Sequence, residues 1–247
     1  MNLSEFFKEN NRVALGFSGG VDSSYLLYAA LKNGAVVRAY YVRSAFQPRF
    51  EFDDAVRMAK ELGADMKVIE VNVLEDDAVA SNPADRCYYC KKTLFGAIRE
   101  RALDDGFDVL MDGTNASDDS EDRPGMKALG EFSVRSPLRE CGLTKAEIRR
   151  LSKEAGLFTW NKPAYACLAT RIPAGDRITP ELLAKIEGAE GELFAMGYSD
   201  FRVRVYKGAA RLQFPEEQME TALKERDEII RKLSPFFELV FLDLKGR

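Results

Sequence analysis

Short apolar runs alternate with amphipathic segments along residues 1–160 of the chain. The apolar runs cover residues 13–17, 35–42, 66–71 and 108–111. Between the second and third runs, apolar residues recur at helical spacing over positions 52–62. Short buried strands separated by amphipathic helices indicate βαβ units and a parallel sheet covered on both faces. We therefore predict an α/β fold with a Rossmann-like sheet.

The pattern changes near residue 178. Thr179 precedes a proline in a typical helix start, and residues 201–206 and 209–214 have the pattern of a hairpin. A second helix and a last strand at residues 237–242 follow, so the tail is expected to form a small α+β domain. The predicted parts are residues 1–160, a site-forming connection at 161–177, and residues 178–247.

The chain has 247 residues, and none of them is histidine. This absence excludes Ser-His-Asp and Cys-His catalytic groups, histidine-ligated zinc and an imidazole general base. The formal net charge of -4 disfavours a broad surface for binding nucleic acid. We therefore expect chemistry carried by thiols, carboxylates, cations or a bound ion, and no nucleic-acid partner.

No apolar run approaches the ~18 residues that a membrane-spanning helix needs, and the N-terminal residues lack the regions of a signal peptide. We therefore expect a cytoplasmic protein without a membrane partner. The chain contains four cysteines. A reducing cytoplasm favours metal-binding or catalytic roles for them over disulfides.

The segment SGGVDSS, residues 18–24, directly follows the first predicted strand. Ser18, Gly19 and Gly20 are small enough for the backbone to approach a ligand closely, and the next helix begins with unpaired N–H groups. The segment is therefore a candidate phosphate-binding loop. It is neither a Walker A loop nor a GxGxxG turn, and the structural alternative is a plain Gly-Gly turn.

Two further polar segments follow predicted strands. Gly113, Thr114 and Asn115 come after the strand at 108–111, and Ser44 lies just beyond the strand at 35–42. The carboxyl ends of parallel strands meet at one edge of a sheet, where nucleotides bind in such folds. We therefore expect these residues near the phosphate-binding loop.

Three cysteines are candidate ligands. Cys87 and Cys90 are three residues apart, so on a helix they share a face and can chelate one ion or cluster. Cys167 is a third thiol further along the chain. The open alternatives are a zinc site of four cysteines that includes Cys141, a redox pair, and an iron–sulfur cluster held by three thiolates. The preferred interpretation of Cys141 itself is a small buried apolar residue.

Two arginines are candidates for binding an anion. Arg202 and Arg204 alternate with valines, so both lie on one face of the predicted strand and suit a phosphate. On the preceding helix, Glu187 and Glu190 are candidates for polar or metal contacts, but the preferred interpretation is that both are solvated side chains. The other cations to consider are Lys91, Lys92, Arg123 and Arg171.

Several strings between residues 18 and 246 together resemble the LarE family of ATP-dependent sulfur transferases, in the PP-loop (N-type ATP pyrophosphatase) superfamily. The strings are SGGVDSS, DRCYYCKK, DGTNASD, RSPLRECGLTKAEIRRLSKEAGL, KPAYACLATRIPAG, FRVRV and FLDLKG. The resemblance implies that ATP adenylylates a carboxylate of pyridinium-3,5-biscarboxylic acid mononucleotide. Sulfur then displaces AMP to give a thiocarboxylate for nickel-pincer cofactor synthesis. It also implies a homo-oligomer.

The resemblance implies residue roles as well. It gives Lys92 and Cys167 catalytic roles beside Asp22, which is also placed near Mg²⁺. Arg171, Arg202 and Arg204 are implied in substrate binding. The residues implied in ATP binding are Ser18, Gly19, Gly20, Asp22, Ser23, Ser44, Gly113, Thr114 and Asn115.

Two sulfur sources occur in families of this kind. Either Cys167 gives up its own sulfur, or three cysteines hold a [4Fe-4S] cluster whose open iron carries sulfide. The additional pair Cys87 and Cys90 favours the cluster, with Cys167 as third ligand. The competing functions are tRNA thiolation by a PP-loop enzyme and a non-catalytic nucleotide- or metal-binding module.

Overall fold

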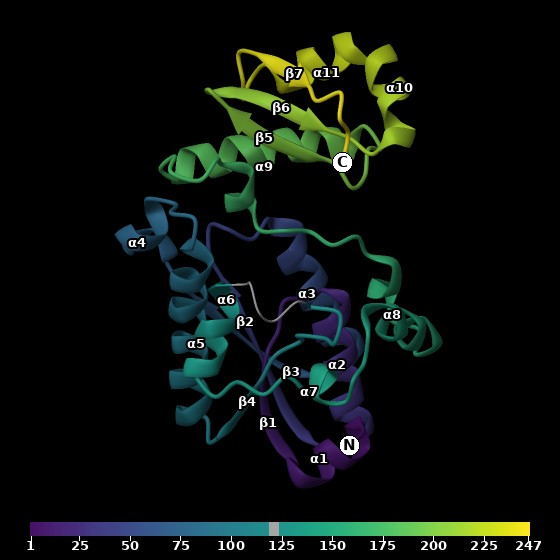
Figure 1. Cartoon of the computed structure of the whole chain (residues 1–247). Helices are drawn as coiled ribbons and strands as arrows, with labels where there is room; N and C mark the ends of the chain where they lie inside the picture. The colour runs from purple at the N-terminus through teal and green to yellow at the C-terminus, as the bar shows by residue number, and fades with distance from the viewer. Residues whose placement is uncertain (119–123) are drawn as a thin grey trace. The chain divides into compact units, whose positions relative to one another are not determined.

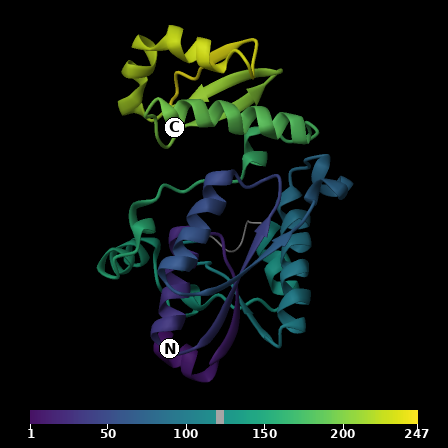
Figure 2. The same cartoon turned by 180° about the vertical axis from the view of Figure 1, so that it is seen from behind.

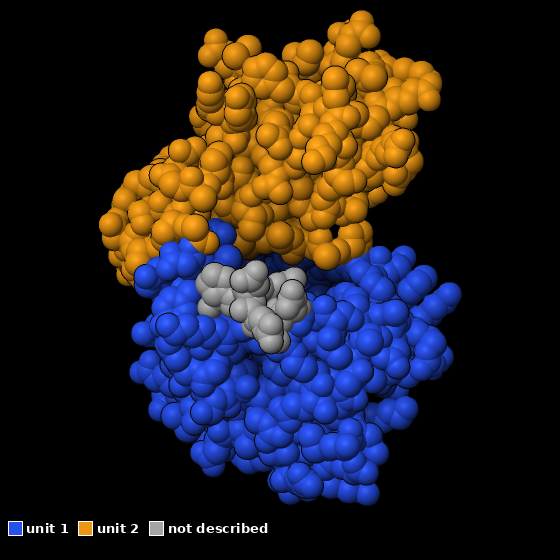
Figure 3. Space-filling model, viewed as in Figure 1, with its two compact units in different colours: residues 1–73, 85–162 blue, residues 74–84, 163–247 orange. Residues whose placement is uncertain are grey.

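The computed structural model describes residues 1–118 and 124–247. The chain divides into two compact units, which Figure 3 colours separately. Unit 1 contains Met1–Val73 and Asp85–Lys162, and unit 2 contains Leu74–Ala84 and Pro163–Arg247. The predicted boundaries place residues 74–84 in the first domain, whereas the structure places them in unit 2.

Unit 1 contains a parallel sheet in the order β3-β2-β1-β4 (Figure 1). Val13 of the central strand pairs with Val37 on one side and with Val109 on the other. These strands coincide within two residues with the predicted apolar runs, and the α/β fold is confirmed. The strands are β1 Arg12–Gly16, β2 Val36–Arg43, β3 Asp65–Glu70 and β4 Val109–Met111.

Helices cover both faces of this sheet, as Figures 1 and 2 show. Successive side chains of a strand point to opposite faces. Leu15 therefore joins the core that contains Leu26 and Ile148, while Ala14 packs with Ile98 and Ala102. The helices of unit 1 are α1 Leu3–Glu9, α2 Val21–Lys32, α3 Arg49–Glu61, α5 Arg86–Asp104, α6 Pro124–Glu131, α7 Pro137–Glu140 and α8 Lys145–Glu154, with a 3₁₀ turn η2 at Phe158–Asn161.

Unit 2 is a small α+β unit with a three-stranded sheet in the order β5-β6-β7. The predicted hairpin is present as the antiparallel pair β5 and β6, and β7 joins β6 in parallel. The strands are β5 Arg202–Tyr206, β6 Ala209–Gln213 and β7 Val240–Leu242. The helices are α4 Asp77–Ala80, α9 Pro180–Ala195, α10 Glu216–Lys224 and α11 Arg226–Leu233, with a 3₁₀ turn η3 at Leu168–Arg171. The 3₁₀ turn η1 Val73–Glu75 begins at the last residue of the first segment of unit 1 and continues into unit 2.

The prediction of a single helix between the hairpin and the last strand is wrong. Two helices occupy this part of the chain, and Glu225 both ends α10 and begins α11 with a non-helical ψ of 12°.

The segment 74–84 is held in unit 2 by hydrogen bonds of its backbone and of Asn82. The N–H of Gly175 donates to the carbonyl of Asn82, and Asn82 Nδ2 donates to the carbonyl of Pro173 at 2.8 Å.

In the described ranges, no helix is both long enough and apolar enough to cross a membrane.

Candidate active site

The predicted phosphate-binding loop joins the end of β1 to the start of α2. Ser23 Oγ links its two sides, because it lies 3.3 Å from both the Ser18 nitrogen and the Gly20 carbonyl oxygen. Gly19 has a φ of +71°, and a Cβ there would lie 2.9 Å from the Cβ of Ala55 on α3. Both the backbone conformation and the available space therefore require glycine at this position.

The N-terminus of α2 points its N–H groups into this loop. Gly20 is the N-cap residue and supplies no side-chain hydrogen bond to the first turn. The first N–H groups of an α-helix have no partner within the helix and carry partial positive charge. This end of the 12-residue helix α2 is therefore suited to an anion, as the sequence predicts.

The loop after β4 approaches the phosphate-binding loop closely. A Cβ on Gly113 would lie 2.9 Å from the backbone nitrogen of Ser23. Thr114 Oγ1 donates to Asp112 Oδ2 at 2.5 Å, and Asn115 Oδ1 accepts from the N–H of Ser117 at 2.8 Å. The structure thus brings together the two segments that the sequence places at the carboxyl edge of the sheet.

Asp22 forms an ion pair that the sequence analysis did not predict. Lys145 Nζ, on the first residue of α8, lies 2.5 Å from Asp22 Oδ2. The other carboxylate oxygen, Oδ1, is buried and has no hydrogen-bond partner among the residues that the structure describes. Burial raises the pKa of Asp22, and the hydrogen bond from Lys145 opposes this shift. Oδ1 is therefore an unused oxygen ligand at the phosphate-binding loop.

Ser44 lies at the end of β2, beside a surface hollow of about 560 Å³ that also borders Arg43, Glu70 and Asn72. Its hydroxyl donates to Gln47 Oε1 at 2.7 Å, and the same oxygen accepts from the Ser44 N–H. This hollow is at the carboxyl ends of β2 and β3. It is large enough to hold a nucleobase, although ATP binding by Ser44 stays a prediction.

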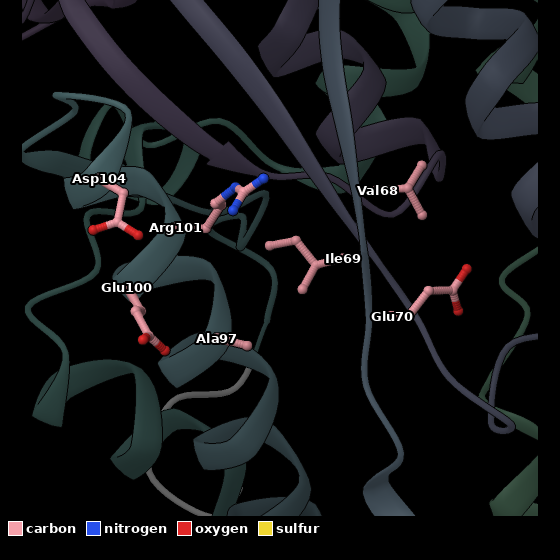
Figure 4. A pocket seen from close by; sticks show the side chains of 7 residues that line it. All are labelled: Val68, Ile69, Glu70, Ala97, Glu100, Arg101 and Asp104. Carbon is pink, nitrogen blue, oxygen red and sulfur yellow. The ribbon is translucent and has the colours of Figure 1, made fainter.

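A second cavity in unit 1, of about 400 Å³, lies between β3 and α5 (Figure 4). None of the residues predicted to bind ATP, metal or substrate lines it. Its side chains are Val68, Ile69, Glu70, Ala97, Glu100, Arg101 and Asp104.

Cys87 and Cys90 lie one turn apart in the first part of α5, in unit 1. Arg86 Nη2 lies 3.8 Å from Cys87 Sγ. Lys92, on the same helix, has a 55% exposed side chain whose Nζ lies 3.9 Å from Glu131 Oε2. Cys167 belongs to unit 2, and within the described residues there is no group of three Cys, Asp or Glu side chains that could hold a metal ion.

Cys167 immediately precedes the 3₁₀ turn η3. Its carbonyl accepts from both the N–H and the hydroxyl of Thr170, at 3.0 and 2.8 Å. The segment therefore has a fixed turn directly after the thiol. Cys141, in unit 1, was interpreted as a small buried residue, and the structure places it in a partly buried position.

The three arginines predicted to bind substrate all donate to backbone carbonyls around Cys167. Arg171 Nη1 lies 2.9 Å from the Ala166 oxygen, Arg202 Nη2 lies 2.8 Å from the Ala164 oxygen, and Arg204 Nη1 lies 2.6 Å from the Thr170 oxygen. Burial and the neighbouring Arg171 lower the pKa of both Arg202 and Arg204. These arginines therefore hold the segment that carries the thiol.

Glu190 is the anion at the centre of this cluster. It is 2% exposed, so its interpretation as a solvated side chain is wrong. It accepts from Arg171, from the hydroxyl of Tyr165 and from the N–H of Val203. Glu187 is partly buried on the same helix, and Lys91 lies on α5. Arg123, another predicted cation, lies outside the described residues.

Unit 1 combines a parallel α/β sheet with a phosphate-binding loop at the carboxyl ends of its strands. These are the features of a PP-loop ATP pyrophosphatase. Enzymes of this class use ATP with Mg²⁺. A comparison with protein-family models found no match. Comparison with known proteins is more specific.

The chain is 35% identical to the pyridinium-3,5-bisthiocarboxylic acid mononucleotide synthase of Lactiplantibacillus plantarum over 97% of this chain and 88% of that protein. It is also 35% identical to an uncharacterized protein of Synechocystis, over 99% of this chain and 93% of that one. The chain belongs to the LarE family of ATP-dependent sulfur transferases, and the resemblance is confirmed.

More distant relatives support the superfamily. A tRNA-specific 2-thiouridylase MnmA of Thermotoga is 25% identical to this chain, over 61% of this chain and 54% of that protein. The predicted classification as a sulfur-transferring enzyme of the PP-loop class is confirmed by the similarity to the synthase of Lactiplantibacillus plantarum.

Proposed function

We propose that the chain adenylylates a carboxylate of pyridinium-3,5-biscarboxylic acid mononucleotide with ATP and converts it to a thiocarboxylate. The observation that carries the proposal is the close approach of Gly113 to the Ser23 nitrogen at the uncapped start of α2. The relative from Lactiplantibacillus plantarum supports the substrate, since its name gives the thiolated product.

The phosphate-binding loop would hold the β and γ phosphates of ATP. Gly19 and Gly20 bring the backbone close to these phosphates, and the first N–H groups of α2 stabilise the charge that develops on departing pyrophosphate. Ser18 and Ser23 keep the loop in shape through their hydroxyl contact at 3.1 Å. Gly113, Thr114 and Asn115 would border the nucleotide on the other side.

A magnesium ion fits beside Asp22. The buried Oδ1, which has no partner in residues 1–118 and 124–247, is the kind of oxygen ligand that this hard cation prefers. One protein carboxylate with phosphate oxygens is a usual magnesium ligand set. When bound, the ion supplies neutralising charge at the phosphates. The loop N–H groups and Lys145 remain the chain's own groups for that task.

The proposed reaction has two displacements. A substrate carboxylate oxygen bonds to the α phosphorus, and the bond from that phosphorus to the β-phosphate oxygen breaks, which releases pyrophosphate. A sulfur nucleophile then bonds to the acyl carbon, and AMP leaves with the original carboxylate oxygen. Activation is needed because a carboxylate has only oxide as a leaving group, whereas AMP leaves as a stabilised anion.

Cys167 is the proposed site of the sulfur step. The finer prediction, a [4Fe-4S] cluster on Cys87, Cys90 and Cys167 that carries sulfide, rests on the number of cysteines and stays a proposal. Protein purified without oxygen should contain iron and acid-labile sulfide, and its polypeptide mass should stay unchanged after turnover. A mass loss equal to H₂S on the Cys167 peptide would instead establish sacrificial transfer.

Incubation of the protein with ATP, Mg²⁺ and the pyridinium dicarboxylate tests the proposed activity. We expect AMP and pyrophosphate in equal amounts, and their formation should depend on the dicarboxylate. ADP formation, or no turnover with intact binding of ATP, would contradict the proposal and favour a non-catalytic nucleotide-binding module. The predicted homo-oligomer and cytoplasmic location stay predictions.

The MnmA relatives favour tRNA thiolation as a second candidate function. The net charge of -4 argues against it, because RNA binding depends strongly on basic surface. An electrophoretic mobility shift with bulk tRNA at moderate salt separates the candidates. Tight and salt-sensitive binding would support tRNA thiolation, and no shift would support the small carboxylate substrate.

A further inference from the structure

Arg86, the first residue of α5, is a buried cation that the proposed function does not use. The residue is 6% exposed, and its Nη1 has no hydrogen-bond partner among the residues that the structure describes. Burial of a charged donor without a partner costs free energy, so such a group in a native structure indicates a bound ligand or water. A guanidinium only donates hydrogen bonds, so that ligand must present an acceptor.

The three arginines that the sequence predicts to bind substrate are engaged elsewhere. Arg171, Arg202 and Arg204 donate to backbone carbonyls of unit 2, and Arg171 also pairs with Glu190. The proposed substrate nevertheless has two carboxylates to bind. Arg86 is a cation of unit 1 with a donor still available for one of them.

The side chains around Arg86 suit a planar anion. The guanidinium carbon lies 5.5 Å from the centre of the Phe46 ring, and Nη2 lies 3.8 Å from Cys87 Sγ. Phe46 is fully buried, and its N–H donates to Ser44 Oγ at 3.3 Å. A ring against the face of a guanidinium leaves the N–H groups in its plane for a ligand. A carboxylate matches this planar fork with two parallel hydrogen bonds.

The start of α5 adds positive potential at the same place. This helix has 19 residues, and no acidic residue lies in its first turn. In the described part of the chain, the side chain of the N-cap residue Asp85 makes no hydrogen bond to that turn. The first N–H groups of a helix carry partial positive charge. The helix start and the Arg86 side chain therefore both favour an anion.

We propose that the guanidinium of Arg86 binds a carboxylate of the substrate, with Nη1 as one of the donors. This inference rests on the proposed function and adds a substrate-binding residue to its site. The substrate has two carboxylates, so one can be held by Arg86 while the other attacks the α phosphorus of ATP. Arg86 thus orients the acid for its activation.

A purely structural role of Arg86 predicts different behaviour. If the guanidinium serves only to pack the start of α5 against Phe46, its replacement lowers the stability of the unliganded protein and leaves substrate affinity unchanged. If the guanidinium is kept for a ligand, an apolar side chain of similar length removes a buried charge without a partner. The melting temperature of the unliganded protein then does not fall, although substrate affinity does.

The test is calorimetric titration of the full chain with the pyridinium dicarboxylate mononucleotide, with nicotinamide mononucleotide and with α,β-methylene-ATP plus Mg²⁺. We expect Arg86→Met to weaken binding of the dicarboxylate by roughly 10-fold or more, as for loss of charge-assisted hydrogen bonds. Nicotinamide mononucleotide has the same phosphate but no carboxylate, so its affinity should stay unchanged. The affinity for the ATP analogue should also stay unchanged.

Arg86→Lys keeps a buried cation but lacks the planar fork, so it should retain only part of the dicarboxylate affinity. This variant stays informative if Arg86→Met does not fold. The control is Arg101→Met, which removes an exposed arginine about 22 Å further along α5. It should bind all three ligands like the unmodified protein.

Thermal unfolding supplies the second readout. Without ligand, Arg86→Met should melt at the same temperature as the unmodified protein or higher. The dicarboxylate should raise the melting temperature of the unmodified protein and raise that of Arg86→Met much less, because stabilisation by a ligand follows its affinity.

Two results would overturn this inference alone. One is unchanged dicarboxylate affinity in both Arg86 variants. The other is equal weakening of the dicarboxylate and of nicotinamide mononucleotide, which would assign Arg86 to the phosphate instead. In both cases the unmodified protein still binds the dicarboxylate. If the unmodified protein does not bind it, the proposed function itself fails, and the inference fails with it.

Discussion

Arg171 and Glu190 form a buried ion pair in unit 2, with Arg171 Nε 2.8 Å from Oε1 and Nη2 3.2 Å from Oε2. The two side chains are 0% and 2% exposed. Removal of one partner of a buried ion pair strongly destabilises the folded protein, because the other charge stays buried without compensation. The pair joins α9 to the turn that follows Cys167, so we infer that it positions the thiol.

Glu190→Gln should therefore destabilise the protein and loosen the Cys167 segment. We expect a loss of about 3–5 kcal/mol in the free energy of unfolding, because the Arg171 charge stays buried without its anion. The measurement is urea unfolding, together with the rate of Cys167 alkylation under native conditions. That rate should rise in the variant.

The matched control is Glu192→Gln on the same helix. Glu192 pairs with Lys232 at 2.8 Å, but both side chains are about one third exposed. Such exposed pairs contribute only about 0–1 kcal/mol. Equal effects of the two substitutions, or an unchanged alkylation rate in Glu190→Gln, would show that the buried pair does not position Cys167.

Gly19→Ala should strongly reduce ATP use without unfolding the protein. The added Cβ meets Ala55, and the positive φ adds strain of about 1–2 kcal/mol. Displacement of the loop should reduce ATP-dependent AMP formation about 100-fold. Gly34→Ala is the control, because Gly34 has a φ of +76° but open space around it. We expect Gly34→Ala to have the same backbone strain and to keep the activity. Equal loss of activity in both variants would contradict the specific role of Gly19.

The hydrogen bonds of Asp105, which directly follows α5, predict that the stability of the protein depends on pH. Hydrogen bonds from Lys67, Tyr40 and Arg38 lower its pKa to about 2. An unfolded aspartate titrates near pH ~3.9, so this contribution is complete above that value and is lost as pH falls towards 2.

The difference in melting temperature between the protein and Asp105→Asn should therefore be constant above about pH 5 and shrink as pH falls below 4. The exposed neighbour Asp104→Asn serves as the control for removing one carboxylate at the end of α5. A difference that grows on acidification would refute the assignment.

Cys167→Ser separates activation from sulfur transfer. We expect it to release pyrophosphate with the dicarboxylate and ATP, since the phosphate-binding loop is intact, but to form no thiocarboxylate. Mass spectrometry of the small-molecule products is the measurement. Cys141→Ser should still form thiocarboxylate. Product formation by the Cys167 variant would remove this thiol from the sulfur step.

The sheet of unit 1 was predictable because its strands are short, mostly apolar and bounded by turns. The phosphate-binding loop was predictable for a related reason, since all of its features lie within seven consecutive residues, 18–24. Both the strands and the loop can therefore be recognised from neighbouring residues in the sequence. Burial, and pairing between residues far apart in the sequence, cannot be recognised in this way.

Glu190 and Lys145 illustrate what the sequence could not supply. A glutamate on a helix is usually solvated, and only the arrival of Arg171 and Tyr165 makes its burial favourable. Lys145 stands in an ordinary capped helix start, and nothing near it in the sequence indicates Asp22 as its partner. The placement of residues 74–84 in unit 2 likewise depends on contacts of Asn82 with residues about 90 positions away.

The most direct test of carboxylate activation follows the oxygen atoms. The pyridinium dicarboxylate is labelled with ¹⁸O in both carboxyl groups, and AMP is collected after a single turnover with ATP. If the carboxylate attacks the α phosphorus and sulfur then displaces AMP, each AMP carries one ¹⁸O atom. Unlabelled AMP would mean that water cleaves the nucleotide, and it would contradict adenylylation of the acid.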